Sequence, residues 1–325
     1  MFGLHKSKKR VNIVLKDHVI RYMESDSAGL QGVTNFGEKY LPLGVIEEGK
    51  VKDPTTLELI LDELVRVRRW KGKKLYFCVP DASVVIRPQL VSLDLAEEEI
   101  KGYLYMQLGD QIHLPFERPV FDYKLLGEKE GQQEILMFAY PEDRIRTFEE
   151  VFKDSDLKPM VADLSALSLY RLYYSLDKAK QKDHLLSLQW NVDSIVLTVF
   201  HECRPQFIRY MRTSLDGEFW QEDEEGDAGL VWTDEKSTLE GYEKDQLREV
   251  ERIMSFYRFS VTKGEANVTN ILLSGDWPNM EELYEHCKER FDIPVEWLDL
   301  QPTHGQELAS LPPRFADVYG LSIKA

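Results

Sequence analysis

The residues that could carry catalysis in this 325-residue chain are scattered rather than grouped. Seven histidines lie far apart, and Cys78, Cys203 and Cys287 form no C-x-x-C pair. The sequence has no G-x-x-x-x-G-K-[ST] phosphate loop, no G-x-G-x-x-G after a predicted strand, no H-E-x-x-H and no G-x-S-x-G. The common nucleotide-binding, metalloprotease and esterase signatures are therefore excluded. The cysteine spacing is typical of a reducing compartment.

Two compact clusters of reactive residue types are interpreted as structural. His201, Glu202 and Cys203 are consecutive, and neighbouring residues on a strand point to opposite faces, so they cannot chelate one ion together. The run Glu97–Glu99 is typical of the first turn of a helix, where carboxylates complement the helix dipole. Neither cluster predicts an active site.

Composition narrows the class of protein further. The 41 basic and 57 acidic residues give a net charge of −16, which argues against a nucleic-acid binder. No uninterrupted apolar run approaches the ~20 residues of a membrane-spanning helix. Lys6, Lys8, Lys9 and Arg10 make the N-terminus basic, but no apolar segment of signal-peptide type follows. We expect an acidic cytoplasmic protein of about two domains.

The elements that must position any site show an internal repeat. Residues 11–22 and 185–200 each indicate two apolar strands joined by a polar turn, Lys16–His18 in the first and Asn191–Asp193 in the second. Asp53-Pro54 begins a predicted helix, and residues 73–79 form a strand that is apolar on both faces. A hairpin-led α/β unit that occurs twice predicts a duplicated domain.

A different pattern interrupts the first unit. A helix after Asp94, strands at 120–126 and 134–139 and a helix at 142–153 indicate an inserted α+β module. Further on, residues 213–252 contain fourteen acidic and four basic residues, and Glu222–Asp227 is interpreted as a solvated acidic loop within them.

Several sequence blocks resemble the PilM family, actin-like cytoplasmic proteins of the type IV pilus assembly platform. Their order along nearly the whole chain is more specific than any one of them. The blocks are Leu41–Ile46, Gly49–Pro54, Val79-Pro80, Ser83–Arg87, Pro115-Phe116, Phe121–Tyr123 with Leu126-Gly127, and Glu249–Arg258.

The resemblance implies an α/β, actin-like (ribonuclease H-like) duplicated fold with an inserted α+β subdomain. It implies four subdomains: IA at 1–84 and 158–183, IC at 85–157, IIA at 184–212 and 266–325, and IIB at 213–265. In this fold Mg-phosphate lies between two hairpin turns, each with a carboxylate for hydrated magnesium and a glycine that lets backbone N–H groups approach phosphate.

The carboxylates and glycines of that pattern are replaced here. Val14 and Lys16 stand at the first turn, and Gln189 and Asn191 at the second. The resemblance implies that the vestigial pocket also includes a further set: Asp17, Arg21, Glu249, Arg252, Ser274, Gly275 and Asp276. Four losses at matched positions predict a protein that is not an enzyme and has no cofactor, with Mg-ATP disfavoured. A further alternative is that Asp17, Asp193 or Asp276 binds another metal in place of magnesium-phosphate.

The leading hypothesis is a non-catalytic scaffold. The resemblance implies that it binds the cytoplasmic N-terminal tail of a bitopic inner-membrane PilN-like protein, in a groove between IA and IC. It would thereby be peripheral at the cytoplasmic face of the cell membrane, with no nucleic-acid partner. Candidate groove residues are Val84, Arg87, Gln107, Pro115 and Phe116.

Two alternatives come from other classes. The first is an actin-like ATP-binding protein or ATPase, or a sugar-kinase relative, with atypical phosphate loops. The second is a cytoplasmic platform protein of a type II secretion system or a membrane-tethering actin homologue. The sequence shows neither the membrane span expected after the actin-like domain of the secretion protein nor the amphipathic C-terminal helix of the tether.

Overall fold

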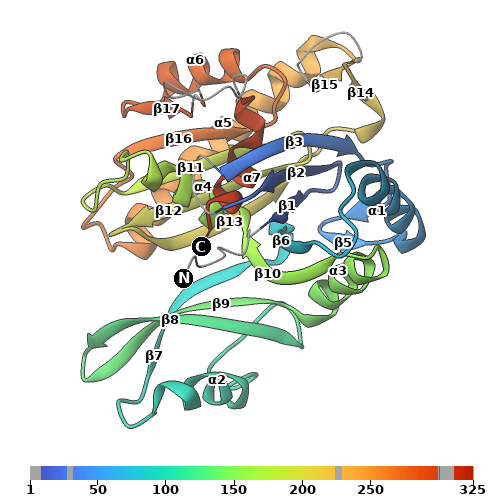
Figure 1. The fold of residues 1–325 in the computed structure, drawn as a ribbon. Coiled ribbons are helices and arrows are strands. Elements are labelled where there is room, and N and C mark those ends of the chain that lie inside the picture. The colour runs from blue at the N-terminus through green and yellow to red at the C-terminus, as the bar shows by residue number, and fades with distance from the viewer. Residues whose placement is uncertain (1–8, 28–31, 224–228, 299, 301–310, 325) are drawn as a thin grey trace, which may run out of the picture.

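Two five-stranded sheets dominate the computed structural model, which describes residues 9–27, 32–223, 229–298, 300 and 311–324 (Figure 1). Lys6, Lys8 and most of the acidic loop 222–227 lie outside the described residues. The first sheet has the order β10-β6-β1-β2-β3, with β1 (Arg10–Leu15), β2 (Val19–Ser25), β3 (Val33–Tyr40), β6 (Lys74–Val79) and β10 (Lys158–Leu164). The second has the order β13-β12-β11-β16-β17, with β11 (Leu185–Trp190), β12 (Ser194–His201), β13 (Arg204–Arg212), β16 (Asn270–Gly275) and β17 (Val295–Trp297).

The two sheets share one topology. In each, three consecutive antiparallel strands are followed by a parallel strand against the first, β6 on β1 and β16 on β11. The hairpins also match in register, because Leu15 pairs with Ile20 and Trp190 with Ile195. The duplicated α/β fold predicted from the two hairpins is confirmed.

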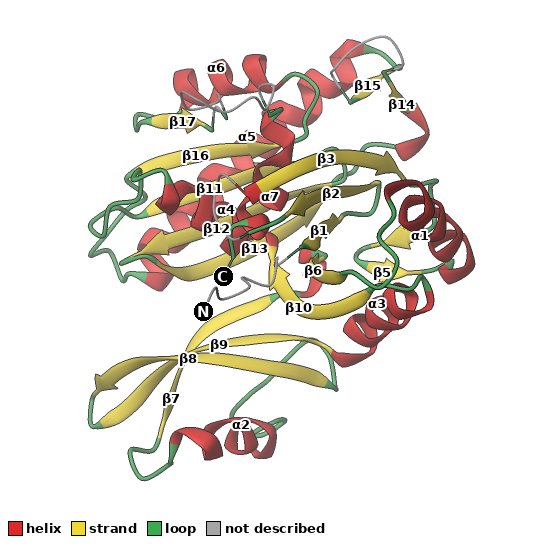
Figure 2. Cartoon of the chain, viewed as in Figure 1, coloured by secondary structure: helices red, strands yellow, loops and turns green. Residues whose placement is uncertain are grey.

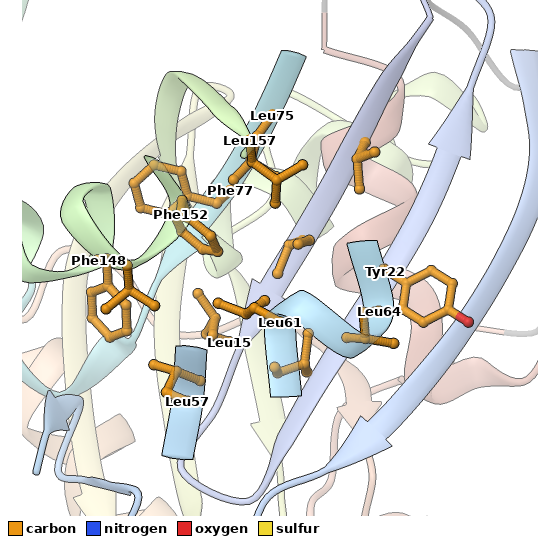
Figure 3. Packing of buried hydrophobic residues seen from close by; sticks show 14 of the residues in the cluster. Leu15, Tyr22, Leu57, Leu61, Leu64, Leu75, Phe77, Phe148, Phe152 and Leu157 are labelled. Atoms are coloured by element: carbon orange, nitrogen blue, oxygen red, sulfur yellow. The ribbon is translucent and has the colours of Figure 1, made fainter. Parts of the chain in front are cut away.

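Helices α1 (Pro54–Arg68) and α3 (Glu142–Asp154) bury apolar side chains against the first sheet. Helix α1 begins as expected, with the Asp53 carboxylate accepting a hydrogen bond from Thr56 N at 3.0 Å. Figure 3 shows Phe148 and Phe152 of α3 in one cluster with Leu57 and Leu61 of α1. The expected insert 85–157 included α3, but these contacts place α3 in the core of the first sheet.

The remainder of the insert is a small separate layer. Strands β7 (Val85–Val91), β8 (Pro119–Lys129) and β9 (Gln132–Pro141) form a sheet of order β7-β9-β8, with α2 (Glu97–Met106) beside it (Figure 2). Its own core contains Ile100 and Leu104 of α2 with Phe121, Ile135 and Met137 of the sheet. Strand β7 also contacts the edge strand β13 of the second sheet.

Two helices each pack against the half of the molecule that does not immediately precede them in the chain, one against the second sheet and one against the first. Helix α4 (Ser165–Ser175) follows the first sheet but packs Leu169 and Leu172 with Leu185 of the second. Helix α7 (Ala316–Ser322), which the expected boundaries place with the second half, packs Val318 and Leu321 in a cluster with β1, β2 and β6. The two helices lie side by side between the sheets (Figure 1).

The second half carries the remaining helices and short strands. Helix α5 (Lys236–Phe256) continues into a π-helical turn at Tyr257–Val261, and α6 (Met280–Arg290) follows β16. Two short hairpins complete the fold: β4 (Ile46–Glu47) with β5 (Lys50–Val51), and β14 (Trp220–Glu222) with β15 (Leu230–Trp232). No helix in the described ranges is long and apolar enough to cross a membrane.

Candidate functional site

The turns of the two long hairpins meet between the sheets. Each is closed by the same backbone bond, Lys16 N to Val19 O at 2.9 Å and Asn191 N to Ser194 O at 2.8 Å. Lys16 and Asn191 therefore occupy equivalent positions. They bond directly to each other, because Lys16 Nζ donates to Asn191 Oδ1 at 2.6 Å.

Lys16 is a buried cation held by the second half and by α7. It is 7% exposed, and its Nζ lies 3.2 Å from an Asp317 carboxylate oxygen. Burial by itself lowers the pKa of an ammonium group, but the attraction of Asp317 and Asp276 outweighs this and raises the pKa of Lys16 above its ordinary value. The side chain is therefore charged in the folded protein.

His18 bridges two carboxylates of the second half. Its Nε2 lies 2.8 Å from Asp276 and its Nδ1 lies 3.1 Å from Asp193. Burial alone lowers the pKa of an imidazole, but Asp276 and then Asp193 raise the pKa of His18 to about 9. His18 is therefore an imidazolium at neutral pH, with both ring nitrogens as donors.

Arg21 extends the network to the edge of the first sheet. Its Nη1 lies 2.8 Å from Asp276, and its Nε donates to Glu38 at 2.9 Å. Glu38 also accepts from Arg314 Nε at 2.9 Å. Asp276 thus receives two cations, and the pKa of its carboxyl falls well below the usual range, because His18, Arg21 and Lys16 outweigh its burial.

Gly275 gives Asp276 its position. The φ of Gly275 is +125°, and a Cβ there would lie 2.0 Å from the Trp190 carbonyl oxygen. Asp276 N donates to that oxygen at 3.1 Å, and the Asp276 carboxylate accepts from Val192 N at 3.0 Å. Only glycine fits the point where β16 leaves β11 and turns its next side chain toward the hairpin turns.

Two further carboxylic acids near the turns, Asp17 and Asp81, have raised pKa values. Burial and the charge of Asp193 raise the pKa of Asp17 to about 6, although its carboxylate accepts from Glu48 N and from Gly49 N at 2.9 Å. Burial likewise raises the pKa of Asp81 to about 6. Asp81 accepts from the Ser165 hydroxyl at 2.7 Å.

The structure brings together some of the predicted pocket residues and separates others. Lys16, Asp17, Arg21, Asn191 and Asp276 surround the turns. Gln189 is buried and donates to Ser165, Ser274 is buried on β16, and Val14 packs in the core that α7 completes. Glu249 and Arg252 lie apart, as an exposed ion pair of 3.1 Å on α5.

Sequence reasoning did not include several members of the network among the site residues. His18 and Asp193 lie in the two predicted turns, so each turn sequence contained a signal for them, and Asp193 was considered only as a possible metal ligand. Glu38, Arg314 and Asp317 belong to no motif. Only the tertiary packing of β3 and the C-terminal segment around α7 reveals them.

The residues present do not fit a magnesium-phosphate group. Val14 and Gln189 supply no carboxylate, while Lys16 and Asn191 fill the space between the turns with side chains that bond to each other. In the described parts of the chain, no three or more His, Cys, Asp or Glu side chains are placed together to hold a metal ion.

A cavity of about 570 Å³ opens beside the turns. Leu43 of the first half reaches across it, since a Cβ on Gly217 would lie 2.6 Å from the Leu43 side chain. His18 and Arg212 are the cationic side chains in its lining. The acidic ones are more numerous: Asp17, Glu47, Asp193, Asp216, Glu218 and Glu222. This excess of negative charge disfavours a polyphosphate ligand.

The five candidate groove residues lie just before β7, on β7 and between α2 and β8, and they divide between two cores. Val84 packs against the core of the first sheet and Phe116 against that of the insert. Pro115 is exposed and Gln107 ends α2. Arg87 is half-buried, and its Nε and Nη2 have no hydrogen-bond partner among the described residues.

Facing hairpin turns on duplicated sheets define the class as the actin-like ATPase fold. The family model described as type IV pilus assembly protein PilM matches residues 17–212, more than half of the chain. The chain therefore belongs to this family, as its sequence blocks predicted. A comparison with curated proteins gave no match.

Solved structures show the same fold at low sequence identity. The chain is similar to one in a PilM-PilN type IV pilus biogenesis complex, with a TM-score of 0.74, 18% identity and coverage of 97% of this chain and 99% of that one. It is less similar to ethanolamine utilization protein EutJ from Carboxydothermus hydrogenoformans, with a TM-score of 0.51, 10% identity and coverage of 97% and 89%. Its TM-score with MreB5 of Spiroplasma citri bound to ADP is 0.51, at 8% identity and with coverage of 97% of this chain and 96% of that one.

Proposed function

We propose that the protein is a non-catalytic scaffold of a type IV pilus, or pilus-like, inner-membrane assembly platform. The observation that carries this proposal is the buried bond between Lys16 and Asn191, with His18 held between Asp193 and Asp276. An actin-like ATPase needs that space for Mg-phosphate. Here the protein's own side chains fill it and neutralise one another.

The network also joins the two halves. Lys16 and His18 come from the first half, whereas Asn191, Asp193 and Asp276 come from the second. A nucleotide would have to separate these pairs and leave several buried charges without partners, which costs several kcal/mol. The acidic cavity beside the turns opposes a triphosphate in addition. The cleft is therefore a structural joint rather than a cofactor site.

A scaffold must act by binding, and the family points to the partner. One of the similar solved structures is a complex of PilM with PilN. We infer that the N-terminal tail of a bitopic PilN-like protein binds this chain between the first sheet and the insert, near Val84, Arg87, Gln107, Pro115 and Phe116. Arg87 supports this site, because its unpaired Nε and Nη2 can bond a carbonyl or carboxylate of the tail. Binding would hold the protein at the cytoplasmic face of the cell membrane.

The absence of a nucleotide function is tested by thermal unfolding with and without Mg-ATP. A ligand at ~100 times its dissociation constant adds about 2.7 kcal/mol to the stability of the fold. We expect no change in melting temperature at millimolar Mg-ATP. A reproducible, magnesium-dependent rise of several degrees contradicts the proposal and favours the alternative of an actin-like ATPase with atypical loops.

Partner binding is tested by titrating a labelled tail peptide of the PilN-like protein. Phe116→Ala should weaken binding by up to ~2 kcal/mol if Phe116 is a buried anchor, and Arg87→Ala should weaken it with a stronger dependence on salt. Phe219→Ala and Arg204→Ala are matched controls outside the site. Because Phe116 also packs in the insert core, the melting temperature of each variant is measured alongside. Equal binding by all five proteins contradicts the groove.

A further inference from the structure

The C-terminal end of α5 differs in charge from the rest of the molecule. Residues 252–264 contain three cations and no carboxylate, in a chain with 57 acidic and 41 basic residues. Glu251 and Glu265 lie just outside this segment. Of its cations, Arg252 pairs with Glu249. Arg258 and Lys263 pair with no carboxylate of the described residues.

The same segment exposes large apolar side chains. Phe256 is 48% exposed, Phe259 63% and Val261 39%. The Arg258 guanidinium lies over the Phe259 ring, 4.9 Å from its centroid and within the ~6 Å of a cation–π contact. At least one cation of this segment is thus in direct contact with an exposed aromatic ring.

This turn is fixed in shape. The Thr262 hydroxyl lies 2.7 Å from the Arg258 carbonyl oxygen, and Gly264 N donates to the same carbonyl at 2.7 Å. The Tyr257 hydroxyl lies 2.7 Å from Nδ1 of His184, the residue before β11, which ties the turn to the start of that strand. Its apolar side chains are therefore presented without further ordering of the backbone.

We propose that this aromatic-cationic turn, Arg252 to Gly264, binds directly to a bilayer surface that contains anionic lipids. Phe256, Phe259 and Val261 would enter the boundary between headgroups and acyl chains. Arg258 and Lys263 would place their cationic ends at the lipid phosphates while their aliphatic stems stay on the apolar side.

Charge complementarity favours a lipid surface over other occupants. Anionic headgroups attract cations that lie within about a Debye length, ~8 Å at physiological salt, so acidic residues elsewhere on the molecule are screened. Exposed phenylalanines beside unpaired cations match both layers of such a surface. This contact goes beyond recruitment by a PilN-like tail, because it requires no partner protein.

The experiment is co-sedimentation of the full chain, without any partner peptide, with two kinds of vesicle. One is pure phosphatidylcholine, and in the other part of it is replaced by phosphatidylglycerol. We expect binding to the anionic vesicles alone, weakening as salt is raised. The double variants Phe256→Ser/Phe259→Ser and Arg258→Gln/Lys263→Gln should each reduce partitioning roughly tenfold or more.

The matched control is Leu59→Ser/Val67→Ser on α1, two side chains that are 65% and 63% exposed. This variant should bind like the wild type. The proposal is overturned if the wild type does not bind anionic vesicles, or if the control loses as much binding as the turn variants. It is also overturned if sedimentation velocity shows a dimer that Phe256→Ser/Phe259→Ser dissociates without affecting lipid binding, since the turn would then be a contact between copies.

Discussion

The two halves of the molecule share a topology but send opposite charges to the point where they meet. The first half contributes the cations Lys16, His18 and Arg21, and the second contributes the anions Asp193 and Asp276. Two like-charged turns at this distance would repel each other in a low-dielectric interior. The difference shows how the two facing turns of a duplicated fold can be complementary in charge to each other.

The charge complementarity of the two halves is tested most directly by neutralising Asp276, the carboxylate that pairs with two cations of the first half. Asp276→Asn removes one of the two carboxylate partners of His18 and one of the two of Arg21 while both cations stay buried, and we expect it to lower the free energy of unfolding by about 3–5 kcal/mol. Urea unfolding at neutral pH measures the loss. Glu249→Gln, which breaks an exposed pair on α5, is the control and should cost at most ~1 kcal/mol. Equal effects of the two variants would mean that the network contributes nothing to stability.

The charge on His18 predicts a pH dependence. Its pKa is about 9 in the folded protein against 6.5 in the unfolded chain, so its contribution is fully present below 6.5 and is lost as the pH rises through about 9. The size of that contribution is about 3 kcal/mol. We expect the free energy of unfolding of the wild type to fall relative to His18→Gln across this window, as followed by urea unfolding at a series of pH values. Parallel profiles would contradict the assignment of His18 as an imidazolium.

The smallest expected effect is the coupling energy between Lys16 and Asp317, which shows whether the two side chains stabilise the fold as a pair. Lys16→Met and Asp317→Asn should each destabilise the protein, whereas the double variant should lose less than their sum. We expect a coupling energy of about 1–3 kcal/mol in the double-mutant cycle. Additive losses would show that Lys16 is held by Asn191 alone.

Much of this fold could be predicted because its signals are local. Alternating apolar residues on both sides of Lys16–His18 and of Asn191–Asp193 specify two hairpins, and Asp53-Pro54 marks the start of α1. The family blocks then supplied the order of the elements. Local patterns could not decide which core each helix joins: α3 has an apolar face, but only packing shows that Phe148 and Phe152 meet the first sheet.

The candidate site could also be predicted only in part: the turn residues could, but their partners elsewhere in the chain could not. Aligning the two turns identified Lys16 and Asn191 as replacements, which indicated what the cleft lacks. That alignment could not show what the cleft gains, because Lys16 pairs with Asp317 near the other end of the chain, and Arg21 pairs with Glu38 across the β2–β3 pairing, outside both turns. Electrostatic networks of this kind depend on tertiary distances, and no spacing rule encodes them.

The packing of α4 and α7 against the opposite halves has a consequence for how the protein is made. The face of the first sheet that bears Val14, Met23 and Cys78 is covered by α7, which is synthesised after every strand of both sheets. At ~5–20 residues per second, the ribosome needs on the order of tens of seconds between β1 and α7. During that interval an apolar sheet face is exposed on the nascent chain. We expect the final compaction of both halves to be post-translational, with the nascent first half a substrate for chaperones.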